Sequence, residues 1–247
     1  MKYVGSKNRH AKEIWEAISK EVGSILSSPY ENYVEPFVGG ANMIDKVPKL
    51  LFAGVYGADV NEHLIELLKA VQEGWVPPET MTEEEYQGLK RDSKLPMPKN
   101  HMAMIAFAGI GCSYSGKWFG GYARGNDANG NPRNYAKESR DNLLKQASNL
   151  KGIRFIHSSY EALTLPINGA SIIYCDPPYM NTTRYVEKIE HDRFWKWCDM
   201  QIERGNKVFV SEYNAPEGWR CIWSKEVNNS LTKDTGCKQG VEKLFTK

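Results

Sequence analysis

The sequence has few cysteines and no long apolar run, and both shortages narrow the class of protein. Five cysteines are scattered over 247 residues without a Cys-x-x-Cys pair, which argues against a disulfide framework and against a zinc site. No apolar stretch approaches the roughly 20 residues that cross a bilayer, and the first residues lack a signal-peptide core. We therefore expect a cytoplasmic protein with reduced thiols, no metal and no membrane partner.

The chain also lacks a strong excess of charge of one sign, but its charges are unevenly distributed. The formal net charge is +2. Residues 90–145 alone contain ten Lys or Arg and four Asp or Glu, a local excess of six positive charges. A basic segment in a near-neutral protein suggests that a polyanion binds there. A solvated basic face without a ligand is the alternative.

The spacing of apolar residues predicts strands that alternate with helices, which implies an α/β fold with a mostly parallel sheet covered on both faces. The predicted strands cover residues 32–37, a run ending near 59, and residues 153–160, 171–175, 207–213 and 241–246. The predicted helices cover residues 7–22, a short segment before 48, an amphipathic stretch after 59, and residues 191–204.

Residues 75–150 break this alternation. They contain five prolines, a glycine-rich tract and most of the basic excess. We interpret them as an inserted, mainly helical subdomain with a hairpin or ordered loop, between two parts of one main domain, 1–74 and 151–247.

Three predicted strands end in residues suited to a ligand, which in open parallel sheets binds beyond the carboxyl ends. Gly39 and Gly40 let the backbone approach a ligand closely. Asp59, about twenty residues later, is suited to accept both hydroxyls of a ribose. A plain turn and a helix cap are the ordinary alternatives, and the full Gly-x-Gly-x-x-Gly pattern is absent. In this order, the two features favour a nucleoside-containing cofactor.

The third strand end, Asp176-Pro177-Pro178-Tyr179, is the most specific feature. Each proline fixes its own φ and carries no N–H, so the turn is rigid and presents acceptors only. The Asp176 carboxylate and the Pro177 carbonyl suit an exocyclic amine on a base, and Tyr179 offers a ring for stacking. Accepting both amine hydrogens favours a pyramidal nitrogen, and the carboxylate stabilises the positive charge that grows as a methyl group arrives. A base in a duplex must be flipped out to reach such a site. A plain turn with a packed tyrosine is the alternative.

The order KYVGSK, EPFVGGANM, ADVNEHLI, HSSYEAL, DPPY and FVSEYNAP resembles the Dam-type DNA adenine-N6 methyltransferases, the D12 class of the alpha group. The resemblance covers nearly the whole chain outside the insert. It implies a Rossmann-like methyltransferase fold, S-adenosylmethionine as cofactor, double-stranded DNA as partner and target recognition by the insert, in a monomer or weak dimer.

The resemblance also implies roles for individual residues. The cofactor-binding positions are Tyr3, Lys7, Glu35, Phe37, Gly39, Asp59, Ser159, Tyr160 and Asp176. Many members carry an acid where this chain has Ser159 and Tyr160. The catalytic positions are Asp176, Pro177, Pro178 and Tyr179.

The insert differs from that of members that read GATC, so no recognition sequence is assigned. The residues expected to contact DNA are Tyr114, Lys117, Trp118, Arg124, Asn126, Arg133 and, after the DPPY motif, Arg184. A core position is the alternative for Trp118.

Other functions stay open at this point. The methylated amine could belong to cytosine N4 or to RNA, and the chain could be a DNA-binding module without activity. The sequence does not distinguish a phage, restriction-modification or orphan setting.

Overall fold

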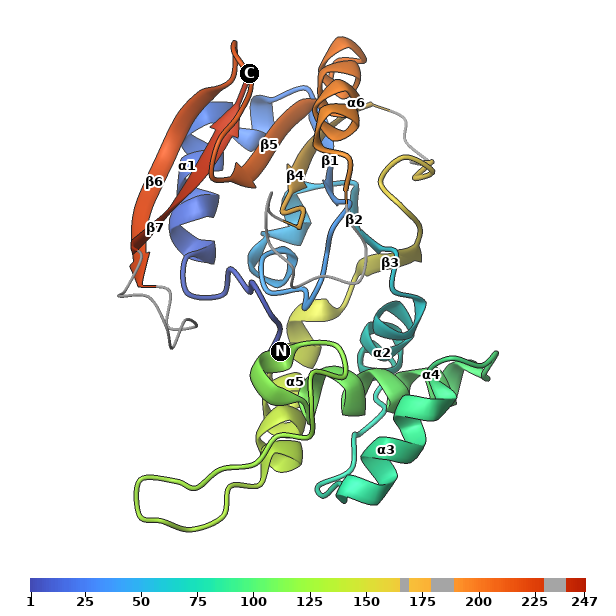
Figure 1. The fold of residues 1–247 in the computed structure, drawn as a ribbon. Helices are drawn as coiled ribbons and strands as arrows, with labels where there is room; N and C mark the ends of the chain where they lie inside the picture. Colours follow the sequence, from blue (N-terminus) through green and yellow to red (C-terminus); the bar gives the residue numbers. More distant parts are fainter. Residues whose placement is uncertain (165–168, 179–188, 229–238) are drawn as a thin grey trace.

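A seven-stranded sheet forms the centre of the protein in the computed structural model, which describes residues 1–164, 169–178, 189–228 and 239–247 (Figure 1). Tyr179 and Arg184 therefore lie outside the described residues. The strands are β1 (Tyr30–Glu35), β2 (Gly54–Asp59), β3 (Ile153–His157), β4 (Ala170–Cys175), β5 (Lys207–Glu212), β6 (Arg220–Asn228) and β7 (Gln239–Thr246).

The strand order is β3-β2-β1-β4-β5-β7-β6. Strands β1 to β5 run parallel, whereas β7 is antiparallel to both of its neighbours. The chain leaves β1 toward β2 and β3 and later returns to place β4 on the other side of β1. The order therefore reverses between β1 and β4, and sheets of this kind bind ligands at that point.

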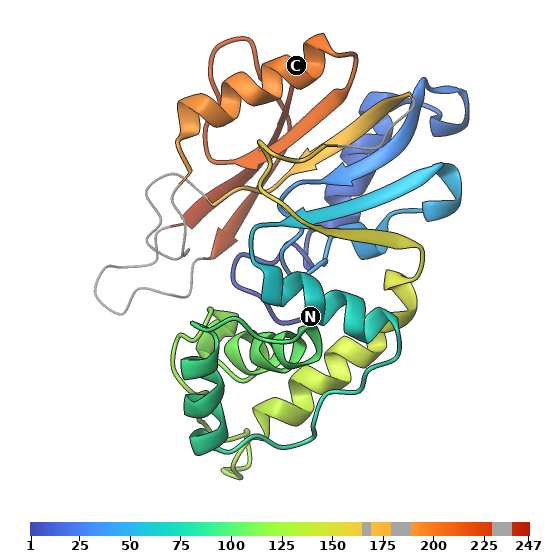
Figure 2. The same cartoon turned by 90° about the vertical axis from the view of Figure 1, so that its right-hand side faces the viewer.

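Helices cover both faces of the sheet, as the view from the side shows (Figure 2). Alternate strand residues point to opposite faces. Tyr33, Ile172 and Phe209 pack in one cluster with α1 (Ala11–Val22). Their neighbours Val34, Ile173 and Val208 pack in another cluster with α6 (His191–Glu203). A strand that is buried on both faces explains the continuous apolar runs in the sequence.

The segment between β2 and β3 is mainly helical, as expected for an inserted subdomain, and lies below the sheet in Figure 1. The later helices of this segment pack on its first helix, α2, which contributes Leu67 and Val71 to their shared core. The helices are α2 (Glu62–Gln72), α3 (Glu83–Asp92), α4 (Lys99–Ala106), a π-helical turn (Phe107–Gly111) and α5 (Tyr135–Leu150). Short 3₁₀ helices cover Ile25–Ser27, Ile44–Lys46, Lys49–Leu51 and Tyr114–Gly116.

Most of the predicted elements are confirmed, with two differences. The short helix expected before Pro48 consists of two separate 3₁₀ turns, Ile44–Lys46 and Lys49–Leu51. Strand β6 was not predicted; it is an edge strand that pairs only with β7. No helix in the described ranges has both the length and the apolar character needed to span a membrane.

The fold predicts a large stability loss when the centre of the α6 face is emptied. Phe194 is fully buried and contacts the rings of Phe37 and Tyr160 at centroid distances of 5.7 Å and 5.6 Å. We expect Phe194→Ala to lower the free energy of unfolding by about 3–5 kcal/mol, because a cavity replaces the ring. Urea unfolding measures the change. Lys196→Ala, on the exposed side of the same helix, is the control and should change it by less than about 0.5 kcal/mol.

Candidate active site

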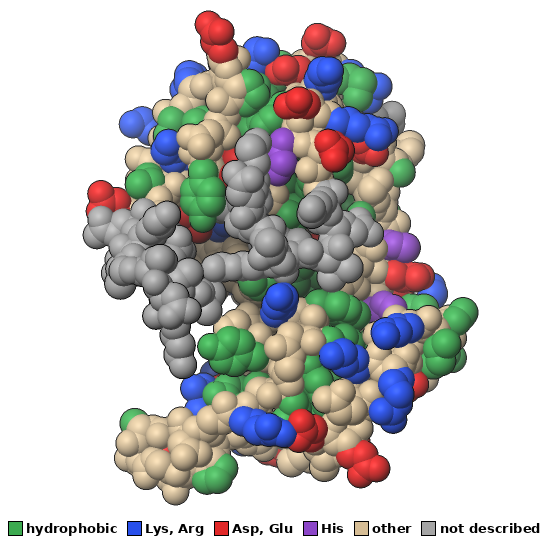
Figure 3. All heavy atoms as spheres, viewed as in Figure 1, with side chains coloured by type: hydrophobic (Ala, Val, Ile, Leu, Met, Phe, Trp, Pro, Cys, Tyr) green, Lys and Arg blue, Asp and Glu red, His purple; other side chains and the backbone are tan. Residues whose placement is uncertain are grey.

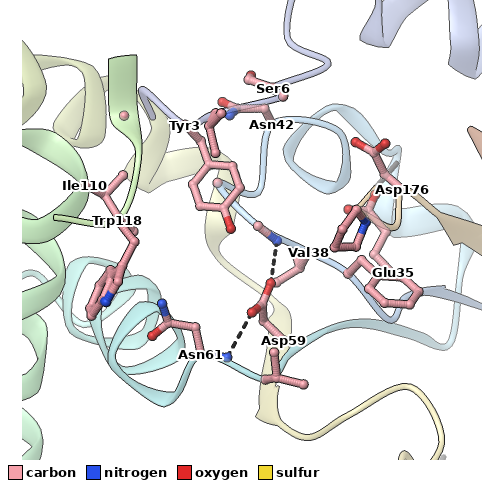
Figure 4. Close-up of a pocket in the computed structure, with 18 of the residues that line it drawn as sticks. Tyr3, Ser6, Glu35, Val38, Asn42, Asp59, Asn61, Ile110, Trp118 and Asp176 are labelled. Carbon is pink, nitrogen blue, oxygen red and sulfur yellow. Dashed lines mark hydrogen bonds between the residues drawn. The ribbon is translucent and has the colours of Figure 1, made fainter. Parts of the chain in front are cut away.

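A cavity of about 440 Å³ lies at the carboxyl ends of β1, β2 and β4, where the strand order reverses (Figure 4). Its walls come from the N-terminal segment, the strand ends and the helical region. A volume of this size is typical of small-molecule sites.

The carboxylate of Asp59 joins two of these walls. Its Oδ2 accepts the backbone N–H of Gly39 at 3.0 Å, and its Oδ1 accepts that of Asn61 at 2.9 Å, as the dashed lines in Figure 4 show. Asn61 in turn caps α2 by accepting the N–H of Leu64. The end of β2 thereby fixes both the turn after β1 and the start of α2.

The turn after β1 requires glycine because Tyr3 lies directly on it. Gly39 has a φ of +47°, and a Cβ there would lie 2.8 Å from the Tyr3 ring. A Cβ on Gly40 would lie 2.7 Å from the Cβ of Tyr3. The Gly-Gly pair therefore provides space for an aromatic side chain that also lines the cavity.

Asp176 lies on the opposite side of the cavity, where β4 ends (Figure 4). Its Oδ1 is 3.1 Å from the Nζ of Lys7, a lysine whose side chain is only 4% exposed. Burial opposes the charge of this ammonium, but the carboxylates of Asp176 and Glu242 outweigh burial and raise the pKa of Lys7. Lys7 is therefore charged at neutral pH.

A second acid on this side, Glu35, is held differently. It is buried at the end of β1, and its Oε1 accepts the hydroxyl of Tyr33 at 2.9 Å. Burial raises the pKa of the Glu35 carboxyl well above its usual range. Burial thus opposes a negative charge on Glu35, which lines the cavity beside the ionic pair.

The helical region closes the cavity with Ile110, Gly116 and Trp118. The ring of Trp118 packs against His63 and Phe119, with centroids 5.6 Å and 5.0 Å apart. The N-terminal segment is attached to the same region, because the N–H of Val4 donates to the carbonyl of Gly116 at 3.3 Å.

Gln146 on α5 connects the helical region to the glycine turn. This buried amide donates to the carbonyls of Gly40 and Ala41 at 3.2 Å and 2.9 Å and to Asp45 Oδ2 at 3.0 Å. Gln146 therefore links the helical region to the turn after β1, which lines the cavity.

The structure brings most of the predicted cofactor and catalytic residues together. Pro177 is buried beside the lining, and neither Ser159 nor Tyr160 belongs to it. Instead, Tyr160 packs against Phe37 and Trp197, and burial raises its pKa to about 12. The predicted residues that line the cavity are Tyr3, Lys7, Glu35, Phe37, Gly39, Asp59, Trp118, Asp176 and Pro178.

Several lining residues were not predicted from the sequence. Asn61 and His63 belong to the first turn of α2, and His157 ends β3. The same rule that identified Asp59, that residues at carboxyl strand ends meet at one edge, would have identified His157. Burial lowers the pKa of His63, so it is a neutral ring at neutral pH.

Apart from Arg184, which lies outside the described residues, the residues predicted to contact DNA belong to the helical region. Lys and Arg side chains are interspersed with acids there (Figure 3). Tyr114 and Lys117 are exposed next to the cavity wall. Asn126 is exposed in a bridged loop with Pro132. Arg124 forms an ion pair with Glu83, and Arg133 forms a two-pronged pair with Glu138. The two arginines are thus the weaker candidates for phosphate contacts in this conformation.

The sequence matches the family model of the D12 class N6 adenine-specific DNA methyltransferases over residues 3–98 and 118–217. The chain belongs to this family. Comparison with curated proteins gives no match. One similar solved structure is the proposed methylase HI0767 from Haemophilus influenzae, with 10% identity, a TM-score of 0.40 and coverage of 96% of this chain and 97% of that chain. Similarity at that level carries no argument about the site.

The family match extends over every strand end that lines the cavity. The residues missing from it include 99–117, which contain α4 and the π-helical turn. The matched ranges thus lie on both sides of this helical segment. Among the described residues, no group of three or more His, Cys, Asp or Glu could hold a metal ion.

The contact of Gly39 with Tyr3 leads to a prediction for this D12 class enzyme. Gly39→Ala combines an unfavourable positive φ with a Cβ that displaces the Tyr3 ring. We expect it to lower the free energy of unfolding by about 1–3 kcal/mol beyond the loss in its control. The control is Gly205→Ala, where φ is +88° and no atom lies within 4 Å of the added Cβ. Urea unfolding compares the two, and equal losses would show that Tyr3 does not restrict the turn.

Proposed function

We propose that the protein transfers a methyl group from S-adenosylmethionine to N6 of an adenine flipped out of double-stranded DNA. The observation that carries this proposal is that Asp59 and Asp176 line the same cavity. One acid is suited to a ribose and the other to an amine, so the cavity offers places for a nucleoside cofactor and an aminated base. Membership of the adenine-specific family supports the same reaction.

The residues around Asp59 fit the cofactor. The Asp59 carboxylate already accepts two N–H groups, and each carboxylate oxygen has a second lone pair for a ribose hydroxyl. The ring of Tyr3 packs on Gly39 and Gly40 and lines the cavity, so it offers a ligand an aromatic surface on this side. When bound, S-adenosylmethionine supplies an electrophilic methyl group on a sulfonium.

Asp176 is the proposed acceptor for the target amine. Lys7 beside it favours the ionised carboxylate, which accepts an amine hydrogen, while the Pro177 carbonyl accepts the other. The amine lone pair then points away from the ring plane, and the carboxylate stabilises the developing positive charge. Tyr179, next in the motif, is the proposed stacking partner of the base.

The energies of base flipping imply that DNA contacts outside the pocket are needed. Unpairing a base requires a few kcal/mol. Stacking on an aromatic ring returns roughly 1–3 kcal/mol, and each amine hydrogen bond contributes about 1 kcal/mol net. Since these terms nearly balance, phosphate contacts from the basic helical region must supply most of the affinity.

Two other functions make different predictions. Methylation of cytosine or RNA would place labelled methyl in those substrates and not in adenine of duplex DNA. An inactive DNA-binding module would transfer no methyl group to any of them. The family match favours adenine, and assays with adenine-only and cytosine-only duplexes distinguish the candidates.

We expect Asp176→Asn to reduce methyl transfer by about 10²- to 10³-fold, because the amide removes the charge that stabilises the amine. Radiolabelled methyl incorporation into DNA measures the rate. Binding of S-adenosylhomocysteine, measured by calorimetry, should remain within a few-fold of the unmodified protein. Asp199→Asn, a half-buried acid of α6 that pairs with Lys247 and does not line the cavity, is the control. Turnover like that of the unmodified protein in Asp176→Asn would refute the proposed chemistry.

For the helical region, we expect Lys117→Ala to weaken DNA binding and to reduce the slope of log K against log salt by about 1. Lys117 is exposed next to the cavity wall and makes no ion pair with the described residues. Fluorescence anisotropy at several salt concentrations measures the slope. Lys20→Ala, at the exposed end of α1, should leave the slope unchanged. If both variants keep the original slope, Lys117 does not contact phosphate.

A further inference from the structure

Lys7 lies between two carboxylates, of which the proposed reaction uses only one. Its Nζ is 3.1 Å from Asp176 Oδ1 and 3.7 Å from Glu242 Oε1. The Lys7 side chain is 4% exposed, and those of Asp176 and Glu242 are 21% and 19% exposed. Lys7 and Asp176 line the cavity, whereas Glu242 is not part of the lining. Glu242 therefore acts on the site through its pair with Lys7 and through its charge, and not as part of the cavity wall.

The sheet topology explains how a residue from β7 reaches this position. Strand β7 is antiparallel to β5, so it begins at the edge where the parallel strands end. Glu242 is near its start. Leu244, two residues further on, packs in the cluster that contains α1. Because alternate residues share a face, Glu242 points to the face on which Lys7 precedes α1.

The charges at this end of the cavity do not cancel. Lys7 contributes one positive charge, and Asp176 and Glu242 contribute one negative charge each, so their sum is −1. Burial raises the pKa of the neighbouring Glu35 carboxyl, which opposes a further negative charge there. The Oε2 of Glu242 is buried without a hydrogen-bond partner among the described residues. Without the charge of Glu242, Lys7 and Asp176 would form a neutral pair.

We infer that Glu242 is a positioning residue that shares the Lys7 ammonium with Asp176 and keeps this end of the cavity at a net negative charge. The inference rests on the proposed function, because it concerns the charge of the methyl donor and of the target amine. Because Glu242 also attracts the Lys7 ammonium, the ion pair between Lys7 and the Asp176 carboxylate is weaker. Asp176 can then accept the amine while its charge still attracts a cation.

This role predicts different effects on the binding of the methyl donor and on the binding of its product. S-adenosylmethionine carries a sulfonium, whereas S-adenosylhomocysteine has a neutral thioether and otherwise the same groups. If the reacting sulfur lies near Asp176, as transfer to an amine held there requires, the net negative charge favours the donor over the product. A residue that merely supports the fold would affect both ligands equally.

The test compares the two ligands on the full chain by isothermal titration calorimetry. Glu242→Gln keeps the shape of the side chain and removes its charge. We expect the dissociation constant of S-adenosylmethionine to rise roughly fivefold to tenfold, the effect of one partly screened charge at short range. That of S-adenosylhomocysteine should change less than twofold. The rate of methyl transfer in a single turnover should fall about tenfold, or about 1.4 kcal/mol, with DNA affinity unchanged.

Two further variants control the result. Glu226→Gln makes the same change of charge at an exposed position on the neighbouring strand β6, and it should leave the ratio of the two dissociation constants as it is. Glu242→Asp keeps the charge and should retain at least half of the original ratio. Circular dichroism verifies that each variant is folded.

The outcomes separate the inference from the proposed function. If the unmodified protein binds S-adenosylmethionine and methylates adenine, but Glu242→Gln weakens both ligands equally or neither, the inference alone is wrong. If the unmodified protein binds neither ligand, the proposed function fails and the inference fails with it. A Glu242→Gln variant that loses its fold is replaced by Glu242→Asp, for which a ratio below half that of the unmodified protein also overturns the inference.

Discussion

The two hydrogen bonds of the Asp59 carboxylate are the constraint on which the rest of the site depends. They join the turn after β1 to the start of α2, so two separate strand ends form one continuous wall. The turn can take this shape only because Gly39 tolerates a positive φ and leaves room for Tyr3. Tyr3 in turn brings the N-terminal segment, and with it Lys7, over the carboxyl edge of the sheet.

The opposite wall depends on how buried charges are balanced. A carboxyl group in a dry position becomes neutral unless a cation or several donors compensate it. Burial shifts Glu35 toward the first course, and Asp176 follows the second through Lys7. Two acids that line one cavity therefore differ in how easily each carries a charge. The rigid turn of prolines therefore begins with one ionised carboxylate, that of Asp176.

Local signals in the sequence were sufficient to predict most of the fold and part of the cavity lining. Strand β4 and the helix after Asp59 could be predicted because the buried face of an element makes apolar residues recur along the sequence in a regular pattern. Parallel strands place their carboxyl ends at one edge of the sheet, so it was possible to predict that Asp59, Gly39 and Asp176 belong to the site. Such rules use only residues close together in the chain, and the same is true of the motifs that resemble the family.

Contacts between distant residues could not be predicted in this way. The pair of Lys7 with Asp176 and the pair of Arg124 with Glu83 depend on how whole elements pack. Trp118 lines the cavity because the helical region folds back on α2, which no local pattern indicates. The edge strand β6 mixes Arg220, Ser224, Lys225 and Glu226 with its apolar residues, so it lacks the continuous apolar run of a strand that is buried on both faces.

The hydrogen bonds of Gln146 limit how freely the helical region can be exchanged between related enzymes. Helix α5 is the last part of that region, yet its amide holds Gly40 and Ala41, and Leu150 at its end packs in the core beside α1. A chimaera that grafts a foreign recognition segment should therefore keep the native α5 and join the new piece before Tyr135. A junction placed after the helix would leave the glycine turn of the host without its support.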